Sequence, residues 1–475
     1  MEPITADLVV VGAGPGGYAA AFAAADRGRT VLLVDQEERL GGVCLNRGCI
    51  PSKALLHATA LIREAKASGT IRGIAFGEPQ VDLERVRAWK EALLEQLGQG
   101  IRSLGQARGV EVMRGRARFE DSQTLRVETA GGQQVIRYQA AIIATGSQPA
   151  MPPSFDLGDP RVMTSTEALE LAEIPKTLLV VGGGYIGLEL GTVYATLGSR
   201  VVLVEAMDTL LPGVDADLVR PVQRSAEQAF QEVRLRAKVL TMATSGQQIR
   251  VTMEAAEAPG GSREERYDRV LVAVGRAPNC DDLGLEHTKV ERDERGFIKV
   301  NAHQQTADPA LYAIGDVVGG ALLAHKASKQ ARVAVESLTG EPSVFEDIVM
   351  PAVVYTDPEL AWCGLTESEA QAKGLAVTVV RFPWSASGRA VSLDRPDGLT
   401  KLLIEPTTER ILGVGLVGAG AGELISEGVL AIEMGATAKD LADTVHPHPT
   451  LSETLMECAQ LFYGTATHAV SRKRR

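Results

Sequence analysis

The sequence predicts an α/β protein in which two βαβ units are interleaved and a C-terminal α+β segment follows. Two observations carry this prediction. A strand, a GxGxxG turn, a helix, a second strand and an acidic residue follow one another twice along the 475 residues, and each copy is followed by an alternating segment and a closing apolar strand. The length is enough for about three domains, and 45% hydrophobic with 23% charged residues is ordinary for a globular α/β chain.

The first unit begins near the N-terminus. A short apolar strand, DLVVV, leads into the turn GAGPGG, an Ala-rich helix and a second strand that ends in Asp35. In such a turn Gly12 permits the tight bend, Gly14 lets the backbone approach a pyrophosphate and Gly17 lets the helix pack on the strand. The helix N-terminus attracts the phosphate charge, and Asp35 is placed to accept from a ribose hydroxyl.

The second unit repeats this pattern. The strand LLVV leads into GGGYIG, with Gly182, Gly184 and Gly187 at the motif positions, and the strand RVVLV ends in Glu205. In both units the acid lies 23 positions after the first glycine. A single glycine turn between strand and helix often serves packing only, but two copies with matching strands, helices and acids predict that one chain binds two dinucleotides.

The side chains around each acid indicate which dinucleotide each unit takes. Glu205 can accept from a 2′-hydroxyl and repels a 2′-phosphate, and no arginine follows it at 206–209, so the second unit is predicted to prefer NAD to NADP. The first unit is predicted to bind FAD, because it lies at the N-terminus close to a pair of cysteines.

Three apolar strands that each end in glycine predict the interleaving. Segments 138–146 and 267–275 each close a small β excursion, and a third, 310–314, is followed by Gly315 and Asp316. The third segment is predicted to return to the first unit, with Asp316 facing the ribityl chain of the flavin. The alternative is that Asp316 caps the start of a helix.

The segment GGVCLNRGCIPSK brings Cys44 and Cys49 close together, although the chain has only five cysteines. Pro51 stands just inside the start of an Ala/Leu-rich run, which is typical of a helix opening, so Cys49 is predicted at a helix N-terminus with Lys53 one turn further on. Both features favour the thiolate. Zinc binding is not favoured because no further ligands cluster with the cysteines, and no metal site is predicted.

Charge and terminal sequence narrow the location and the partners. A net charge of −11 argues against nucleic-acid binding, and no apolar run is long enough to span a membrane. The N-terminus enters a strand almost at once without a signal peptide, so a cytoplasmic location is expected. The basic segment 471–475 is expected to be a solvated terminus.

Four motifs together resemble the flavin disulfide reductases, the class I pyridine nucleotide-disulfide oxidoreductases, and within them the branch that acts on dihydrolipoyl groups. They are GGVCLNRGCIPSK, GGGYIGLEL, YTDPELAW and HPHPTLSE, and the resemblance spans the whole chain. It implies oxidation of protein-bound dihydrolipoyl groups to lipoyl, with electrons passing through a Cys44–Cys49 disulfide and FAD to NAD⁺. It also implies a homodimer and a lipoylated carrier protein or domain as partner.

The resemblance implies a role for particular residues. Cys44 exchanges with substrate thiols, Cys49 faces the flavin, and Lys53 forms an ion pair with Glu189 near the reactive edge of the flavin. His448 is the acid/base, oriented by Glu453 and delivered by the partner subunit. Further implied contacts to FAD come from Gly12, Gly14, Gly17, Asp35, Lys53, Ala117, Thr145, Gly146, Ser147, Asp316, Leu322, Leu323, Ala324 and His325, and those to NAD from Gly182, Gly184, Gly187, Glu205, Val239 and Gly275.

Some positions allow another interpretation. Ala117 stands where the family commonly has glycine, and His446 precedes Pro447 where the family more often has alanine, so His446 is not the preferred base. Thr450 and Glu453 also form a T-x-x-E capping box, which gives Glu453 a structural alternative. Thiol–disulfide exchange needs a base near pH 7, however, and imidazole is the matching side chain.

The predicted organisation has four segments. A surface helix is expected at 81–104, and strands at 377–381 and 400–404 are expected to precede helices. The segments are an FAD-binding domain with the redox disulfide at 1–149, an NAD-binding domain at 150–275, a central segment that completes the FAD site at 276–345 and an interface (dimerisation) domain at 346–475.

Other functions remain as alternatives. An NAD(P)H oxidase or transhydrogenase of the same fold is disfavoured by the intact cysteine segment, and glutathione reductase by the acid Glu205. Mercuric reductase is disfavoured because Cys458 stands alone near the C-terminus. A flavin-binding scaffold that senses redox state is the alternative from a different class of protein.

Overall fold

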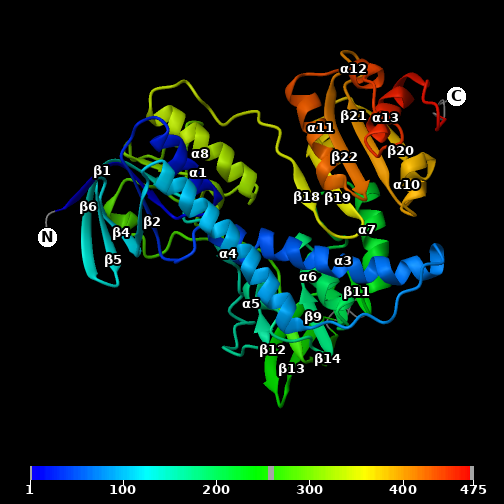
Figure 1. Cartoon of the computed structure of the whole chain (residues 1–475), viewed down its shortest axis with the longest axis horizontal. Helices are drawn as coiled ribbons and strands as arrows, with labels where there is room; N and C mark the ends of the chain where they lie inside the picture. Colours follow the sequence, from blue (N-terminus) through cyan, green and yellow to red (C-terminus); the bar gives the residue numbers. More distant parts are fainter. Residues whose placement is uncertain (1–2, 255–260, 471–475) are drawn as a thin grey trace.

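The structure is a computed structural model that describes residues 3–254 and 261–470, so the basic segment 471–475 lies outside the described residues. Three sheet-based units are arranged around a centre crossed by two long helices (Figure 1). None of the described helices combines the length and the apolar character needed to cross a membrane. The predicted α/β class is confirmed.

The first unit is built on a seven-stranded sheet with the order β3-β2-β1-β6-β5-β4, to which β17 adds beside β6. Strands β1, β2, β3, β6 and β17 are parallel, whereas β4, β5 and β6 form an antiparallel meander. Leu8, Val9 and Val10 are fully buried because both faces of the parallel part are covered, one by helices α1 and α8 and the other by strands β4 and β5 with segment 280–298. The strands are β1 Ile4–Val11, β2 Val31–Asp35, β3 Glu111–Arg114, β4 Arg116–Asp121, β5 Thr124–Thr129, β6 Gly132–Ile143 and β17 Leu311–Ala313.

Helices from distant parts of the sequence cover this sheet. Helix α1 packs beside α8, which comes some 300 residues later (Figure 1). Asp82 caps α4 by accepting from the backbone N–H of Arg85 at 3.1 Å, and α4 confirms the helix predicted at 81–104. The helices are α1 Pro15–Ala25, α2 Gly42–Arg47, α3 Cys49–Ile71, α4 Leu83–Ala107 and α8 Ala324–Leu338, with a short 3₁₀ turn at Gly315–Val318.

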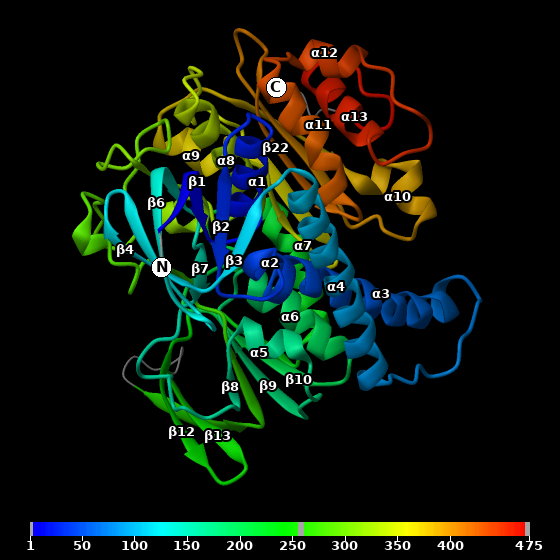
Figure 2. The same cartoon turned by 60° about the vertical axis from the view of Figure 1, so that its left-hand side comes forward.

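The second unit repeats the parallel core on a five-stranded sheet with the order β11-β10-β9-β15-β8. A separate antiparallel sheet, β12-β13-β14, extends from it at the bottom of Figure 2. The strands are β8 Val162–Met163, β9 Thr177–Val181, β10 Arg200–Val204, β11 Glu232–Arg234, β12 Val239–Ser245, β13 Gln248–Glu254, β14 Ser262–Tyr267 and β15 Arg269–Val272, and the helices are α5 Ser165–Glu170, α6 Tyr185–Thr196 and α7 Ala216–Ala229.

The chain passes twice between the first two units. On both passages it forms the two-stranded sheet of β7 (Ser147–Pro149) and β16 (Arg276–Pro278). After a 3₁₀ turn at Leu285–His287 the chain returns to the first sheet, where β17 pairs in parallel with β6. The predicted return of segment 310–314 is therefore confirmed.

The C-terminal unit is an antiparallel sheet, β18-β19-β22-β21-β20, covered by helices. The strand predicted at 377–381 is β20 and a 3₁₀ turn and α10 follow it, as expected. The strand predicted at 400–404 is β21, but the expectation that a helix follows it is wrong, because β21 turns back into β22 and pairs with it antiparallel. The elements are β18 Ala352–Val354, β19 Glu359–Gly364, α9 Glu367–Ala372, β20 Thr378–Pro383, a 3₁₀ turn at Trp384–Ala386, α10 Gly388–Ser392, β21 Leu399–Ile404, β22 Ile411–Gly418, α11 Ala421–Glu433, α12 Ala438–Asp443 and α13 Glu453–Tyr463.

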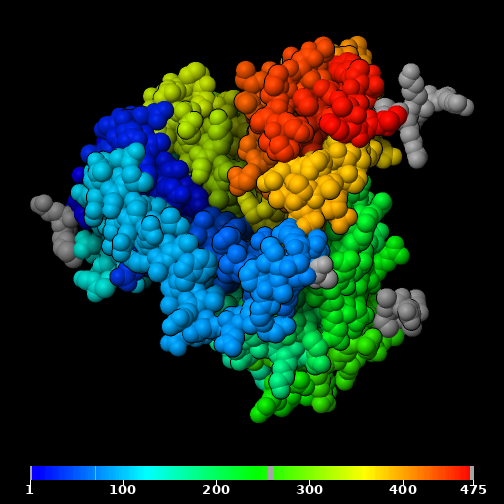
Figure 3. All heavy atoms as spheres, turned by 45° about the vertical axis from the view of Figure 1, so that its right-hand side comes forward, coloured from blue at the N-terminus to red at the C-terminus, as the bar shows by residue number. Residues whose placement is uncertain are grey.

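Charged side chains join the C-terminal unit to the other two. The ammonium of Lys401 is fully buried and lies 2.7 Å from Asp215 and 2.9 Å from Asp217 of the second unit. At the far end of α3, Arg72 donates to Asp394 at 2.8 Å, and Figure 3 shows this blue helix lying against the gold segment that contains α10. The three units are therefore fixed relative to one another by contacts around α3 and α7.

Candidate active site

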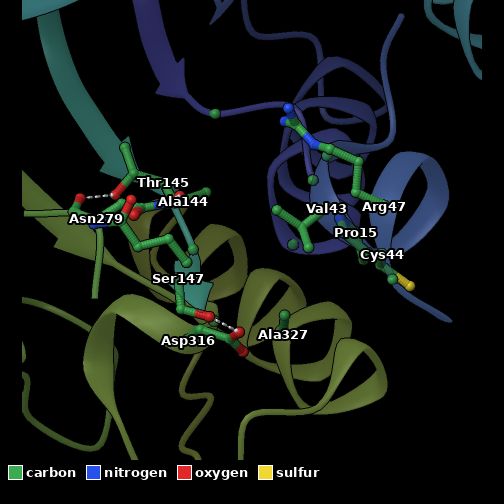
Figure 4. A pocket seen from close by; sticks show the side chains of 18 of the residues that line it. Pro15, Val43, Cys44, Arg47, Ala144, Thr145, Ser147, Asn279, Asp316 and Ala327 are labelled. Atoms are coloured by element: carbon green, nitrogen blue, oxygen red, sulfur yellow. Dashed lines mark hydrogen bonds between the residues drawn. The ribbon is translucent and has the colours of Figure 1, made fainter. Parts of the chain in front are cut away.

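A cavity of about 540 Å³ lies where the first unit meets the start of α6 in the second. Figure 4 shows Cys44 and Arg47 on one side of it and Thr145, Ser147 and Asp316 on the other. Most of the residues predicted to bind FAD or to act in catalysis line it, namely Gly12, Gly14, Asp35, Cys44, Cys49, Lys53, Ala117, Thr145, Gly146, Ser147, Glu189, Asp316, Leu322 and Ala324. Gly17, Leu323 and His325 lie outside this lining, and the His325 ring contacts the Pro351 carbonyl at 2.8 Å.

Both glycine turns are shaped for close backbone approach. Gly12 has a φ of +100°, and a Cβ there would stand 2.4 Å from the Ala144 carbonyl oxygen. A Cβ on Gly17 would stand 1.7 Å from the carbonyl oxygen of Gly12, because the helix packs directly on the strand. The second turn has the same two constraints. A Cβ on Gly182 would stand 2.3 Å from the Ala273 carbonyl oxygen, and a Cβ on Gly187 would stand 2.1 Å from the carbonyl oxygen of Gly182. The two turns therefore fit the same kind of ligand, a dinucleotide pyrophosphate.

Each acid at the end of the second strand holds its own glycine turn. Asp35 accepts from the backbone N–H of Ala13 at 2.5 Å, and Glu205 accepts from that of Gly183 at 2.7 Å. Burial raises the pKa of Asp35, although backbone N–H donors oppose that effect. The two acids therefore occupy equivalent positions. Each carboxylate lies beside its glycine turn, where it can accept a hydrogen bond from a ribose hydroxyl in place of, or together with, the backbone N–H.

The cysteine pair occupies two consecutive helices. Cys44 lies in α2 and Cys49 is the first residue of α3, both as free thiols, and their side chains are hydrogen-bonded to each other. The hydrogen bond from Cys44, followed by the charge of Lys53, lowers the pKa of Cys49 to about 7, against the opposing effect of burial. The same hydrogen bond and burial raise the pKa of Cys44. The pair therefore favours a thiolate on Cys49 and a thiol on Cys44.

Lys53 and Glu189 join the first unit to the second beside the cysteines. The Lys53 ammonium lies 2.8 Å from Glu189 Oε2, and both side chains line the cavity. The Glu189 side chain is only 4% exposed, whereas that of Lys53 is 32% exposed. The predicted ion pair is present, and the buried carboxylate depends on the lysine for compensation.

The opposite wall of the cavity is held by hydrogen bonds around Asp316. Its carboxylate accepts from the Ser147 hydroxyl at 2.5 Å, and Thr145 donates to the Asn279 carbonyl at 2.7 Å (Figure 4). Asp316 lies within a short 3₁₀ turn and accepts no cap hydrogen bond there, so the structure does not favour the alternative in which it caps a helix. A polar wall of this kind fits the hydroxylated chain of a flavin.

His448 and Glu453 lie in the C-terminal unit, outside the cavity lining. His448 Nδ1 contacts Glu453 Oε1 at 2.9 Å, and the second carboxylate oxygen accepts from the Thr450 N–H at 2.7 Å. The His448 side chain is 71% exposed. Only half of the predicted capping box forms: Glu453 accepts from the Thr450 N–H, but helix α13 begins at Glu453 after Ser452, and the Thr450 hydroxyl donates to the Pro447 carbonyl.

His446 belongs to a different contact. Its Nε2 lies 2.7 Å from Glu427 Oε1 and its side chain is 5% exposed, so it is less accessible than His448.

The residues predicted to bind NAD lie on the second unit beyond this cavity. Gly182, Gly184, Gly187, Glu205, Val239 and Gly275 are outside its lining, and Val239 is buried at the start of β12. The start of α6, with Tyr185, Ile186 and Glu189, reaches the cavity. The second glycine turn and the cysteine pair therefore approach the same end of the cavity from two sides.

Sequence reasoning missed several residues of this wall. Arg276 donates to the Ser147 hydroxyl and carbonyl, each at 2.7 Å, and Tyr185 and Asn279 also line the cavity. Arg276 follows Gly275 directly and Tyr185 lies inside the second glycine motif, so position next to a motif was the available signal. Asn279 had none, because its place depends on the pairing of β7 with β16.

Comparison with known proteins agrees with this geometry. Residues 6–331 match the family described as pyridine nucleotide-disulphide oxidoreductase, and residues 350–459 match the dimerisation domain of the same family. The chain is 46% identical over 466 residues to the dihydrolipoyl dehydrogenase of Vibrio cholerae, covering 98% of this chain and 97% of that protein. It is also 46% identical over 475 residues to the dihydrolipoyl dehydrogenase of Thermus scotoductus, covering 98% of this chain and all of that protein.

Solved structures show the same fold. The chain superposes on LpdA from Mycobacterium tuberculosis with a TM-score of 0.88 at 27% identity, covering 97% of this chain and 99% of that one. It superposes on the Cu(II) complex of the HOCl-induced flavoprotein disulfide reductase RclA from Escherichia coli with a TM-score of 0.86 at 28% identity, covering 97% and 100%.

These findings confirm the predicted resemblance and the predicted class of activity, an NAD-dependent flavoprotein oxidoreductase that uses FAD and NAD. The names of the relatives agree with oxidation of dihydrolipoyl groups and do not favour an oxidase, a transhydrogenase or a redox-sensing scaffold. The chain belongs to the pyridine nucleotide-disulphide oxidoreductase family, alongside relatives that are dihydrolipoyl dehydrogenases.

Proposed function

We propose that this protein oxidises dihydrolipoyl groups on a lipoylated carrier protein and passes the electrons to NAD⁺ through Cys44, Cys49 and FAD. One observation carries the proposal: Cys44 and Cys49 line the same cavity as the first glycine turn and Asp35. The cysteine pair that would oxidise a dithiol and the predicted dinucleotide site therefore share one cavity.

Proton transfer from the substrate is the role of His448. Its Nδ1 is engaged by Glu453, so Nε2 is the ring atom available to take a proton from a substrate thiol. Glu453 in turn stabilises the imidazolium that forms. The resulting substrate thiolate attacks Cys44 Sγ, the Cys44–Cys49 bond breaks, and Cys49 leaves as a thiolate.

The second substrate thiol completes the exchange. As it attacks the substrate sulfur of the mixed disulfide, its proton passes to the departing Cys44 sulfur, which leaves as a thiol, and the oxidised lipoyl group is released while His448 keeps the first proton. The raised pKa of Cys44 favours this proton transfer to the departing sulfur, while the helix N-terminus and Lys53 stabilise the negative charge on Cys49. A bound flavin would supply the acceptor for the electron pair of Cys49 and the hydride donor for NAD⁺.

Each of the two glycine turns would bind one of the two cofactors. Gly12, Gly14 and Asp35 would hold the adenylate half of FAD, and the polar wall of Ser147 and Asp316 would hold its ribityl chain. Residues of the second turn and Glu205 would hold NAD, with Val239 and Gly275 beside it.

A homodimer completes the site. His448 is exposed and lies outside the cavity of its own chain, and residues 350–459 match a dimerisation domain, which supports delivery of His448 to the cysteines of the partner subunit. We also propose the four predicted segments, with boundaries after residues 149, 275 and 345; the pairing of β7 with β16 supports the first two boundaries, and the family matches at 6–331 and 350–459 support the third. The protein works in the cytoplasm.

A substrate and cofactor panel tests this function. The FAD-loaded protein should oxidise dihydrolipoamide with NAD⁺ and should turn over lipoylated carrier proteins, with little activity on reduced glutathione or with NADP⁺. Glu205→Ala should reduce the ratio of activity with NAD⁺ to activity with NADP⁺, because the carboxylate that repels the 2′-phosphate is removed. Equal activity with glutathione, or a preference of the unaltered protein for NADP⁺, would contradict the proposal.

A further inference from the structure

Tyr355, which follows β18 in the C-terminal unit, places its ring against the lysine of the active site. The Lys53 ammonium lies 4.5 Å from the ring centroid. Glu189 links the two residues, because its Oε2 lies 2.8 Å from that ammonium and its Oε1 accepts from the Tyr355 N–H at 3.0 Å. A single buried carboxylate thus fixes both the cation and the backbone that carries the ring.

The ring lies behind Lys53 and not in the cavity. Lys53 and Glu189 line the cavity, whereas Tyr355 is outside the lining. The ring packs against the start of α11, where a Cβ on Gly422 would stand 3.5 Å from Tyr355 Cε1, and the Gly422 N–H donates to Glu359 at 2.9 Å. The ring therefore lies next to the start of α11 as well as to Lys53.

We infer that Tyr355 is a positioning residue that holds Lys53 in place beside Cys49 through the face of its ring. An aromatic face attracts an ammonium that lies within about 6 Å of the centroid. It also restricts a long side chain that would otherwise sample many rotamers in the open part of the cavity. Lys53 meets a residue from each unit, so its charge reaches Cys49 in a fixed position only when all three units are assembled.

The chemical consequence is a stronger preference for the Cys49 thiolate. Lys53 is one of the groups that lower the pKa of Cys49, and Tyr355 acts on Cys49 through that lysine. The charged and titratable groups around Cys49 are Cys44 in α2, Lys53 in α3, Glu189 and Tyr185 in α6, and the Tyr355 phenol. Burial raises the pKa of the phenol, so it stays neutral over the working range.

Replacement of the ring tests the inference in the FAD-loaded protein after anaerobic two-electron reduction. The measurement is the long-wavelength charge-transfer absorbance between the Cys49 thiolate and the flavin as a function of pH. Tyr355→Phe keeps the ring face and should leave the midpoint unchanged. Tyr355→Leu removes the face and should raise the midpoint by about half a pH unit, a roughly threefold change in the thiol–thiolate equilibrium. An unchanged midpoint in Tyr355→Leu, or equal shifts in both variants, overturns the inference.

A graded series covers the case in which the leucine variant does not fold. Phenylalanine and its mono- and trifluorinated analogues at position 355 keep the shape of the ring while they weaken its negative face. The midpoint should rise step by step with fluorination, and a flat series overturns the inference. The inference rests on the proposed roles of Lys53 and Cys49 but not on the substrate, so a protein with no dihydrolipoamide activity and a normal fluorination series would refute only the proposed function.

Discussion

Removal of Lys53 should cost more stability than removal of its partner Glu189. In Lys53→Met the Glu189 carboxylate, only 4% exposed, still accepts the hydrogen bond from the Tyr355 N–H but no longer has the Lys53 ammonium as its counter-ion. Breaking a buried pair in this way costs about 3–5 kcal/mol, and the low end applies because the lysine side is one-third exposed to the cavity. In Glu189→Gln the amide still accepts a hydrogen bond and the ammonium can turn towards water, so the expected cost is about 1 kcal/mol.

Denaturant unfolding of the FAD-saturated protein measures this difference. Lys439→Met is the matched control, because Lys439 pairs with Asp443 on the solvent-facing side of α12, with side chains 63% and 61% exposed, and its loss should change little. The expected order of destabilisation is Lys53→Met, then Glu189→Gln, then Lys439→Met. Equal midpoints for the first two variants would refute the argument that the buried carboxylate is the costly partner.

Two further predictions concern buried or oriented charges. Lys401→Met should destabilise the protein by about 3–5 kcal/mol relative to Lys439→Met, because Asp215 is left buried without its cation; equal unfolding midpoints for the two variants would contradict this. Burial raises the pKa of Glu453, but the hydrogen bonds from the Thr450 N–H and His448 outweigh burial and hold that pKa below its usual range. The ionised carboxylate therefore stabilises the folded protein above the ordinary glutamate pKa of about 4.3, and this stabilisation is lost as the pH falls below that value. Glu453→Gln should remove this loss from melting curves recorded between pH 3 and pH 6 and lower kcat for dihydrolipoamide by at least about tenfold; an unchanged kcat would contradict the orienting role.

The sequence was most informative where a motif requires particular local geometry. Gly12 and Gly182 both adopt left-handed φ values against a neighbouring strand, and Asp35 and Glu205 both hold their own turns, as the repeated pattern predicts. The position of Cys49 at a helix start followed from Pro51, because proline fits the first turn of a helix.

Features that depend on tertiary pairing were not available from the sequence. Strand β21 has the apolar character of a strand that precedes a helix, yet its antiparallel register with β22 makes the next element a strand. The ion pair of Lys401 with Asp215 and the contact of Tyr355 with Glu189 each join residues more than 150 positions apart in the sequence, and no local pattern predicts either contact. Glu453 is placed by contacts with both His448 and the Thr450 N–H, so its spacing predicts only one of these two contacts.

The most direct test of the account is the behaviour of Cys44→Ser in the FAD-loaded protein. This variant has no partner for substrate exchange, and Cys49 remains as a free thiolate beside the flavin. We predict that it retains FAD, shows a charge-transfer band without any reductant, is reduced by NADH and does not oxidise dihydrolipoamide. Full dihydrolipoamide turnover by this variant, or a spectrum with no charge-transfer band at any pH, would contradict the passage of electrons through the cysteine pair.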